Sequence, residues 1–275
     1  MLFSRRLAWF LLPFACCPAR AAGRRIPLHS GDSHQALSAS YDTDIASVGA
    51  DDELVFGPQT FDVRRPLDEG AIHGLNRIFH LKDGRVLRVA SRADNRWTIG
   101  EYLRGYERLR EILIGIAGLP AEHLPLVEVD AEASVADLYV LQGFETIRFT
   151  FADVFGEGRT VFLPDAQRLR VLREFLDFVR KTAVISWADD VHGENVVYTD
   201  RGWIFLDFRE SFEYTLDPNQ PTFLARFCQN RLPDLWWRRV LAVIAEERTR
   251  LANLTERPCE RVVSQGGRSK PLQVQ

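Results

Sequence analysis

Two short β-prone runs in the first half of the chain flank a polar turn. Apolar and β-branched residues at 78–81 and 86–90 are separated by Lys82-Asp83-Gly84-Arg85. Because Asp-Gly between two such runs is typical of a tight hairpin turn, we expect two antiparallel strands here. Residues 67–71 are expected to form a turn that leads into this hairpin.

The segment after the hairpin carries apolar residues at a helical spacing. Between Ile99 and Ile116 they recur with a period of about 3.6, which predicts one amphipathic helix. Its apolar positions are Tyr102, Leu103, Tyr106, Leu109, Ile112 and Leu113. Apolar runs at 124–129 and 138–141 predict further strands of the same sheet. The first half should therefore hold about five strands and one helix.

The second half opens with helical periodicity and then contains a second hairpin. From Pro164 onward, a long helical pattern places apolar residues at Leu169, Leu172, Phe175, Leu176 and Val179. Strand-like residues at 195–198 and 203–207 flank a turn at 199–202. Helical patterns follow near 222–230 and 232–251. An order of strands first and helices later predicts an α+β fold.

The first 21 residues have a different character from the rest. Ser4-Arg5-Arg6 precedes an apolar run at 7–17, and Ala19-Arg20-Ala21 then offers small residues for cleavage. This order is typical of a secretory signal peptide, and the run is too short to span a bilayer. We expect residues 1–21 to be removed, leaving a secreted protein with no stable membrane insertion. An apolar N-terminal arm or a misassigned start codon is the alternative.

The composition of the chain indicates which segments are globular and which class of partner is excluded. A chain with 46% hydrophobic and 27% charged residues is globular, yet residues 22–52 are rich in Ser, Gly, Asp and His without a period. We therefore expect a disordered leader at 22–52 and a flexible tail at 258–275. With 35 Lys+Arg against 38 Asp+Glu, the chain has no basic field for binding nucleic acid. Cys228 and Cys259 would remain after cleavage, and whether they pair is open.

Three polar residues around the second hairpin suit phosphoryl transfer. Such a reaction needs metal ions on the phosphates, a carboxylate near the acceptor hydroxyl and a cation on the phosphate oxygens. Asp190 and Asn195 precede the first strand of the hairpin, and Asp207 ends its second strand. A hairpin of this length can return Asp207 beside Asn195, so that both face one Mg²⁺. By itself, Asp190 would be an ordinary helix cap or turn residue.

The same residues carry a resemblance to a known family. Asp190-Val191-His192-Gly193-Glu194-Asn195 resembles the kinase catalytic loop, and Leu206-Asp207-Phe208-Arg209 resembles the Asp-Phe-Gly element with Arg in place of Gly. The Asp-x-His-Gly-x-Asn pattern of this loop is similar to that of aminoglycoside-phosphotransferase-type kinases and of compact bacterial effector kinases. It implies a two-lobed protein-kinase-like fold. Its N-lobe at 53–144 would be an antiparallel sheet with one helix, and its C-lobe at 145–257 would be reduced and mostly helical.

The resemblance also implies roles for individual residues. Asp190 would be the catalytic base, Asn195 and Asp207 would be the metal ligands, and Arg88 would stand where the phosphate-binding Lys normally does. Glu101 would be its partner on the helix. Glu107 and Glu111 are alternatives to Glu101.

Residues that would hold the nucleotide match the family less closely. Gly70 and Gly74 lie where the glycine-rich loop would approach the phosphates, although Asp68 replaces the first glycine. Gln142 and Gly143 would stand at the end of a strand and the hinge, where backbone groups hold adenine. The resemblance therefore implies ATP and Mg²⁺ as cofactors.

Three functions are compatible with this pattern. The first is an ATP- and Mg²⁺-dependent Ser/Thr protein kinase, exported and acting on a protein in a host cell, because the N-terminal pattern indicates export and a host cytosol contains ATP. The absence of an Ala-Pro-Glu element and the minimal C-lobe resemble compact effector kinases or small-molecule phosphotransferases. The second is a small-molecule phosphotransferase for a sugar, lipid or antibiotic. The third is a pseudokinase binding module, suggested by Arg88 and the missing glycine. Transfer of AMP instead of phosphate is also open.

Overall fold

A computed structural model gives the fold of the chain. The residues described are 23–28, 39–66, 76–90, 96–135, 138–143, 146–189, 191–207, 209 and 211–256. The expected signal peptide at 1–21 and tail at 258–275 lie outside them, as do Gly70, Gly74 and Asp190. Of the described helices, none is long and apolar enough to cross a membrane.

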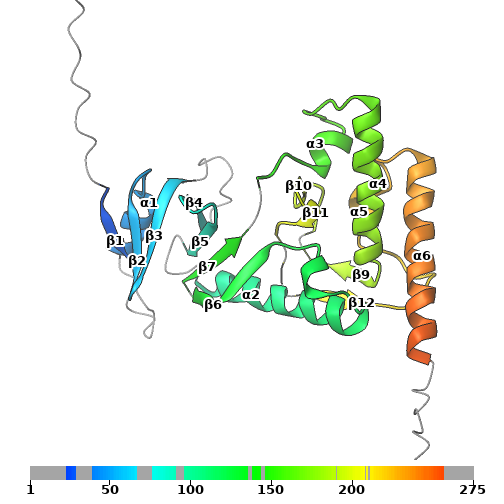
Figure 1. The fold of residues 1–275 in the computed structure, drawn as a ribbon, viewed down its shortest axis with the longest axis horizontal. Helices are drawn as coiled ribbons and strands as arrows, with labels where there is room; N and C mark the ends of the chain where they lie inside the picture. The colour runs from blue at the N-terminus through cyan, green and yellow to red at the C-terminus, as the bar shows by residue number, and fades with distance from the viewer. Residues whose placement is uncertain are drawn as a thin grey trace, which may run out of the picture.

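A seven-stranded sheet forms the N-terminal half (Figure 1). The expected hairpin at 78–90 is confirmed, and its turn contains Gly84 at a φ of 89°. The strands are β1 (Arg25–Pro27), β2 (Glu53–Phe56), β3 (Gln59–Pro66), β4 (Asn76–Leu81), β5 (Val86–Ala90), β6 (Glu128–Val135) and β7 (Tyr139–Gly143). They lie in the order β1-β2-β3-β4-β5-β7-β6, with only β1 and β2 parallel among these neighbours.

The expected leader at 22–52 is structured at two places, which corrects the sequence interpretation. It contributes β1 to the sheet and a helix, α1 (Ala39–Ala46). Its apolar residues are too widely spaced to produce a period, but they are buried against strands that lie far away in sequence. Four of them join Leu54 and Leu87 in one hydrophobic cluster: Ile26, Leu28, Ile45 and Val48.

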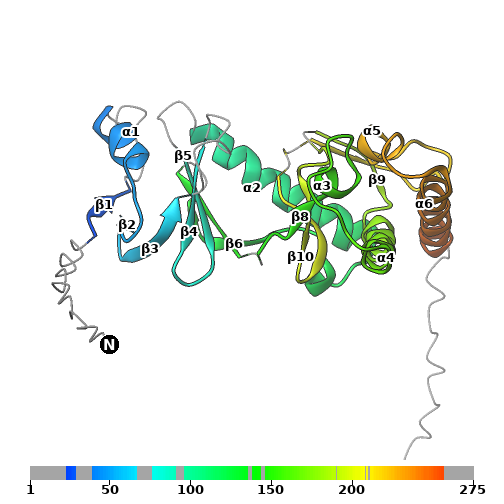
Figure 2. The same ribbon diagram turned by 90° about the horizontal axis from the view of Figure 1, so that it is seen from above.

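The helix expected at 99–116 is confirmed as two consecutive elements. The α-helix α2 (Arg96–Arg110) continues into a π-helical turn, η3 (Glu111–Ile116). Its apolar face contacts β5 and β7, and it also contacts β12 (Phe212–Tyr214) in the other half. Figure 2 shows α2 running from the sheet to the C-terminal half. A short 3-10 turn, η4 (Ala121–His123), follows before β6.

The C-terminal half combines helices with two small sheets. Its helices are α3 (Phe151–Phe155), α4 (Asp165–Lys181), α5 (Ala225–Cys228) and α6 (Asp234–Glu256). The expected long helix is α4, and it lies beside α6 (Figure 1). The expected second hairpin is confirmed as β10 (Val196–Thr199) and β11 (Gly202–Phe205), which β8 (Phe149–Thr150) extends to three strands. A further strand, β9 (Ile185–Ala188), pairs with β12.

An aromatic cluster fixes the second hairpin on α4. Trp203 of β11 is 4% exposed, and its Nε1 donates a hydrogen bond to the Val171 carbonyl oxygen of α4 at 3.0 Å. Rings of β8, α3, α4 and β10 surround it at Phe149, Phe151, Phe155, Phe175 and Tyr198. Such ring pairs stabilise by roughly 0.5–1.5 kcal/mol each beyond their burial. The hairpin therefore rests on a rigid base.

Arg248 of α6 is a fully buried cation that donates to backbone carbonyl groups. Its Nε donates to the Ala183 oxygen at 2.7 Å, and its Nη1 donates to the Gln220 oxygen at 2.7 Å. Carbonyl oxygens of Asp217, Ile185 and Pro221 accept from the same guanidinium. Burial lowers the pKa of Arg248. This side chain ties α6 to β9 and to the segment that follows β12.

The described architecture is mixed α+β, as expected, with a curled sheet in the first half and helices gathered in the second. The first half holds more than the expected strands and helix, because β1, β2, β3 and α1 were not predicted. Cys228 is a free, buried thiol in α5, whereas Cys259 lies outside the described residues.

Candidate functional site

The second hairpin brings Asn195 next to the residue before Asp207. Asn195 immediately precedes β10, and Leu206 immediately follows β11. The Leu206 amide donates to the Asn195 carbonyl oxygen at 2.8 Å, which extends the ladder by one step. Asn195 and Asp207 therefore lie at the same end of the hairpin, the geometry that the sequence predicts. Their role as metal ligands stays a prediction.

The loop before β10 is anchored from two directions. Val191 is 3% exposed, and the Gly193 carbonyl oxygen accepts a hydrogen bond from the Ala152 amide of α3 at 3.0 Å. On the other side, the Asp189 amide donates to the Ser211 oxygen at 3.1 Å. Residue 190 follows directly after this anchor, but the expected catalytic base itself lies outside the described residues. The loop therefore starts and ends at fixed points on the C-terminal half.

Arg88 extends from the sheet to the end of this hairpin. It lies within β5, is 8% exposed, and its Nη1 is 3.2 Å from Oδ1 of Asp207. Burial alone would lower the pKa of Arg88, but the Asp207 carboxylate holds that pKa above its ordinary value. Its Nε is buried and has no hydrogen-bond partner among the described residues. Arg88 is therefore a charged side chain with an unused donor beside a carboxylate.

Tyr102 of α2 is the residue that packs on Arg88. The guanidinium carbon lies 4.4 Å from the centroid of the Tyr102 ring, which is 3% exposed. The Tyr102 hydroxyl donates to the Leu206 carbonyl oxygen at 3.3 Å and accepts from Nε2 of Gln142. Burial raises the pKa of Tyr102 well above its ordinary value, so the hydroxyl stays neutral.

The expected pairing of Glu101 with Arg88 is not formed in this structure, where Arg88 contacts Asp207 and Tyr102 instead. Glu101 is partly exposed, and no ion pair between Glu101 and Arg88 is present among the described residues. Adjacent helical positions point about 100° apart, so a helix that turns Tyr102 toward Arg88 directs Glu101 elsewhere. The alternatives, Glu107 and Glu111, are both exposed, and Glu111 pairs with Arg108.

The two expected hinge residues have different surroundings. Gln142 is 3% exposed and directs its side-chain amide at Tyr102, while Gly143 pairs with Glu128 at the end of β7. The structure therefore joins Arg88, Tyr102, Gln142 and Asp207 into one network. Tyr102 was missed as a site residue, although its place among the apolar positions of the helix was the signal that it faces inward.

The oxygen donors at this end of the second hairpin are of the kind that a hard cation binds. Asp207 supplies a carboxylate and Asn195 an amide, which are ligands that Mg²⁺ accepts. Among the described residues, no group of three or more His, Cys, Asp or Glu side chains could hold a metal ion. In type, these two residues fit a magnesium ion, which would supply positive charge to phosphate oxygens when bound.

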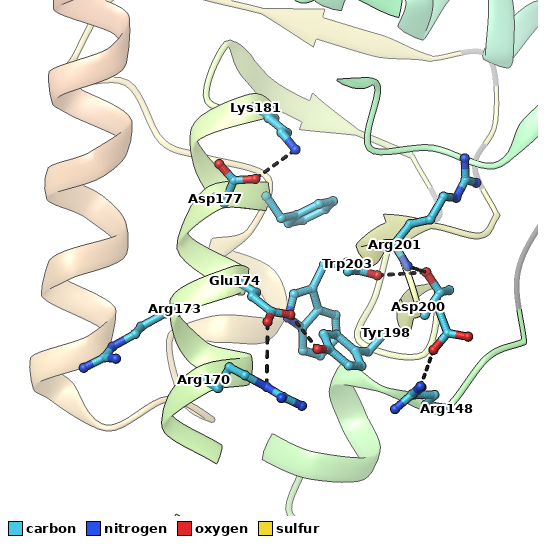
Figure 3. A pocket seen from close by; sticks show the side chains of 13 residues that line it. Arg148, Arg170, Arg173, Glu174, Asp177, Lys181, Tyr198, Asp200, Arg201 and Trp203 are labelled. Carbon is cyan, nitrogen blue, oxygen red and sulfur yellow. Dashed lines mark hydrogen bonds and ion pairs between the residues drawn. The ribbon is translucent and has the colours of Figure 1, made fainter. Parts of the chain in front are cut away.

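A cavity of about 690 Å³ lies at the other end of the same hairpin (Figure 3). It is bounded by α4 and by the β10–β11 turn, and it contains none of the expected site residues. Figure 3 shows Glu174 facing Tyr198, whose hydroxyl donates to it at 2.5 Å. Arg148 pairs with Asp200, and Lys181 with Asp177. The side chains that line the cavity are thus linked largely by local ion pairs, and these pairs do not involve the network around Arg88.

Comparison with known proteins adds three solved structures. No protein-family model and no curated protein matches the chain. Two crystal structures of the Mycobacterium tuberculosis PknI kinase domain align with TM-scores of 0.33 and 0.32 at 15% and 16% identity, over 68% and 67% of this chain and 70% and 71% of theirs. The MAP kinase LmaMPK10 from Leishmania major aligns at 0.30 with 18% identity, over 55% of this chain and 46% of its own.

All three structures are of kinases. TM-scores of this size describe a small overall likeness, so the functional argument below rests on this chain's own residues.

Proposed function

We propose that this chain is an ATP- and Mg²⁺-dependent phosphotransferase with a protein-kinase-like fold. The observation that carries the proposal is the contact between Arg88 and Asp207. A buried cation of the sheet and a carboxylate at the end of the second hairpin meet beside Asn195, and these are the kinds of group that phosphoryl transfer from a nucleotide uses. The family resemblance of the loop at 190–195 supports the same reading.

The described residues fit the phosphate end of a nucleotide. Arg88 keeps one buried donor without a partner, and a guanidinium can bind phosphate oxygens through two parallel hydrogen bonds. The Asp207 side chain is 39% exposed, so an ion can reach its carboxylate from solvent. Magnesium, when bound, would neutralise charge on the phosphates, with Asn195 and Asp207 as its protein ligands. Asp190 would accept the proton of the acceptor hydroxyl in this proposal.

The proposed acceptor is a Ser or Thr hydroxyl of a protein outside the producing cell. The N-terminal pattern of basic, apolar and small residues supports export, and the cytosol of a host would supply the ATP. The near balance of 35 Lys+Arg and 38 Asp+Glu argues against a nucleic-acid partner.

A second candidate function is a nucleotide-binding module without catalysis. Arg88 replaces the compact lysine of the family, and it occupies an oxygen of the carboxylate that would hold the metal. A small-molecule phosphotransferase is the third candidate. It differs from a protein kinase in its acceptor, because the hydroxyl belongs to a small molecule and not to a protein. The experiment below distinguishes all three candidates.

The test uses the full 275-residue chain with Mg²⁺ and either γ-labelled or α-labelled ATP. Host lysate proteins, small alcohols and the chain itself serve as acceptors. Label from γ-labelled ATP on a protein supports a protein kinase, label on an alcohol supports the small-molecule reading, and transfer of α-label indicates AMP. Binding of Mg²⁺–ATP without transfer supports the binding module.

Two variants make the test specific. Asp207→Ala should abolish transfer, because it removes a proposed metal ligand. Asp200→Ala is the matched control, since Asp200 lies in the turn at the opposite end of the same hairpin and pairs with Arg148. The proposal fails if the wild-type chain does not bind Mg²⁺–ATP, or if both variants lose activity equally.

A further inference from the structure

Tyr102 occupies a central place in the network without any role assigned to it so far. It lies on the buried face of α2, between Arg88 of the sheet and Leu206 at the end of the second hairpin. At 3% exposure, its ring and hydroxyl are both removed from solvent. Each end of the side chain contacts a different part of the proposed phosphate site.

The ring determines how Arg88 is presented. With its guanidinium carbon 4.4 Å from the ring centroid, Arg88 is in the range of a cation–π contact, which is strongest where both partners are desolvated. A planar guanidinium stacked on a ring loses the freedom to rotate about its last bonds. A neutral ring also adds no second negative charge beside Arg88, which already contacts the Asp207 carboxylate at 3.2 Å.

The hydroxyl determines the backbone position just before Asp207. It accepts from the Gln142 amide of β7 and donates to the Leu206 carbonyl oxygen at 3.3 Å. Gln142 is 3% exposed, so this chain of hydrogen bonds has little competition from water. It connects the sheet, α2 and the hairpin end through one side chain.

We propose that Tyr102 is a positioning residue for the phosphate-binding site, taking the place that the sequence gives to Glu101. Its ring orients Arg88 toward the phosphates, and its hydroxyl orients Asp207 toward the metal through the Leu206 carbonyl. The inference rests on the proposed function, because it assigns Tyr102 to the same site. The two ends of the side chain can be separated by substitution.

The experiment compares Tyr102→Phe with Tyr102→Leu in the full chain. Binding of ADP is titrated calorimetrically with and without Mg²⁺, and the Nε–Hε signal of Arg88 is followed by NMR for its ring-current shift. Tyr106→Phe is the control. Tyr106 lies one turn further along α2, is 5% exposed, and its hydroxyl accepts from Arg110 instead of contacting the network.

The Phe variant should keep the ring-current shift and bind metal-free ADP within about twofold of wild type. Its enhancement of binding by Mg²⁺ should fall by roughly tenfold, because the Leu206 carbonyl and Gln142 lose their shared partner. The Leu variant should lose the ring-current shift as well, and its affinity for metal-free ADP should fall by roughly tenfold. Tyr106→Phe should change none of these quantities.

If the wild-type chain binds Mg²⁺–ADP and both Tyr102 variants bind it equally well, the positioning role is overturned and the proposed function stays intact. Absence of ADP binding by the wild-type chain would overturn both. If Tyr102→Leu fails to fold, Tyr102→Phe decides through its response to Mg²⁺. A Phe variant with wild-type Mg²⁺ enhancement then contradicts the proposal.

Discussion

Arg88 and Asp207 stand 119 residues apart in the chain, and their side chains meet at 3.2 Å between Nη1 and Oδ1. The two partners differ in environment, because the Arg88 side chain is 10% exposed and that of Asp207 is 39% exposed. An ion pair with one partner in water contributes little to stability, because water solvates that partner when the pair is broken. The pair is therefore expected to matter for ligand binding much more than for folding.

Replacing Arg88 with Met tests that expectation. The variant removes a buried cation with an unsatisfied Nε and leaves Asp207 in contact with water. We expect the free energy of unfolding to stay within about 1.5 kcal/mol of wild type. Affinity for Mg²⁺–ADP should fall by at least about tenfold. Urea unfolding and calorimetric titration measure the two quantities, and a variant that loses stability but keeps its affinity would reverse the assignment.

Arg248 should behave in the opposite way. Its guanidinium donates to five backbone carbonyl oxygens, two of them in the buried residues Ala183 and Ile185, which cannot turn to solvent. Arg248→Met should lower the free energy of unfolding by at least about 3 kcal/mol. Arg250→Met, two positions along α6 and paired at the surface with Glu247, should cost less than about 0.5 kcal/mol. Equal losses in the two variants would contradict this role.

Two glycines in the loop after α3 make a matched pair. A Cβ on Gly156 would lie 2.3 Å from the backbone oxygen of Ala152, whereas a Cβ on Gly158 would meet nothing within 4 Å. Gly156→Ala should therefore destabilise by about 1–3 kcal/mol, because the backbone must move. Gly158→Ala should be neutral or stabilise by up to about 1 kcal/mol. The order of their melting temperatures checks this, and a more stable Gly156→Ala variant would refute the close approach.

Alkaline pH should weaken the sheet through Tyr139. Burial raises the pKa of Tyr139 from its ordinary value of 10.0 to about 12. The unfolded chain therefore loses this proton first, so the stabilisation is complete below pH 10 and is lost as the pH rises toward 12. Tyr139→Phe cannot ionise, and its unfolding free energy should decline less steeply over that range. Urea unfolding at a series of pH values shows the difference, and parallel curves would contradict it.

Sequence patterns predicted the elements whose signals are local. The turn with Gly84 and the turn before Trp203 identified both hairpins, because their turn residues lie between adjacent β-prone runs. The helix α4 was predicted because its buried residues repeat along one face. Strand β1 and helix α1 were missed, since Ile26 and Ile45 are buried by strands that follow much later in the chain.

The candidate site was predicted only where local strand pairing brings its residues together. Asn195 and Asp207 belong to one hairpin, so their shared end follows from local pairing. The partner of Arg88 depends on how α2 is rotated against the sheet, and a periodic pattern does not resolve neighbouring positions. That is why Glu101 was expected where Tyr102 lies.

Strand β1 has a consequence for how the chain tolerates processing. Ile26 and Leu28 are 5% exposed, and the Arg24 guanidinium pairs with Asp52 at 2.7 Å, so these few residues cover one end of the hydrophobic cluster that includes Leu54. Proteolysis after Ala21 would spare all of them. A cut a few residues later would expose apolar side chains and the outer edge of β2. The unpaired backbone groups at that edge could then pair with a strand of another chain. Trimming of the N-terminus is therefore harmless only if it stops before residues 23–28.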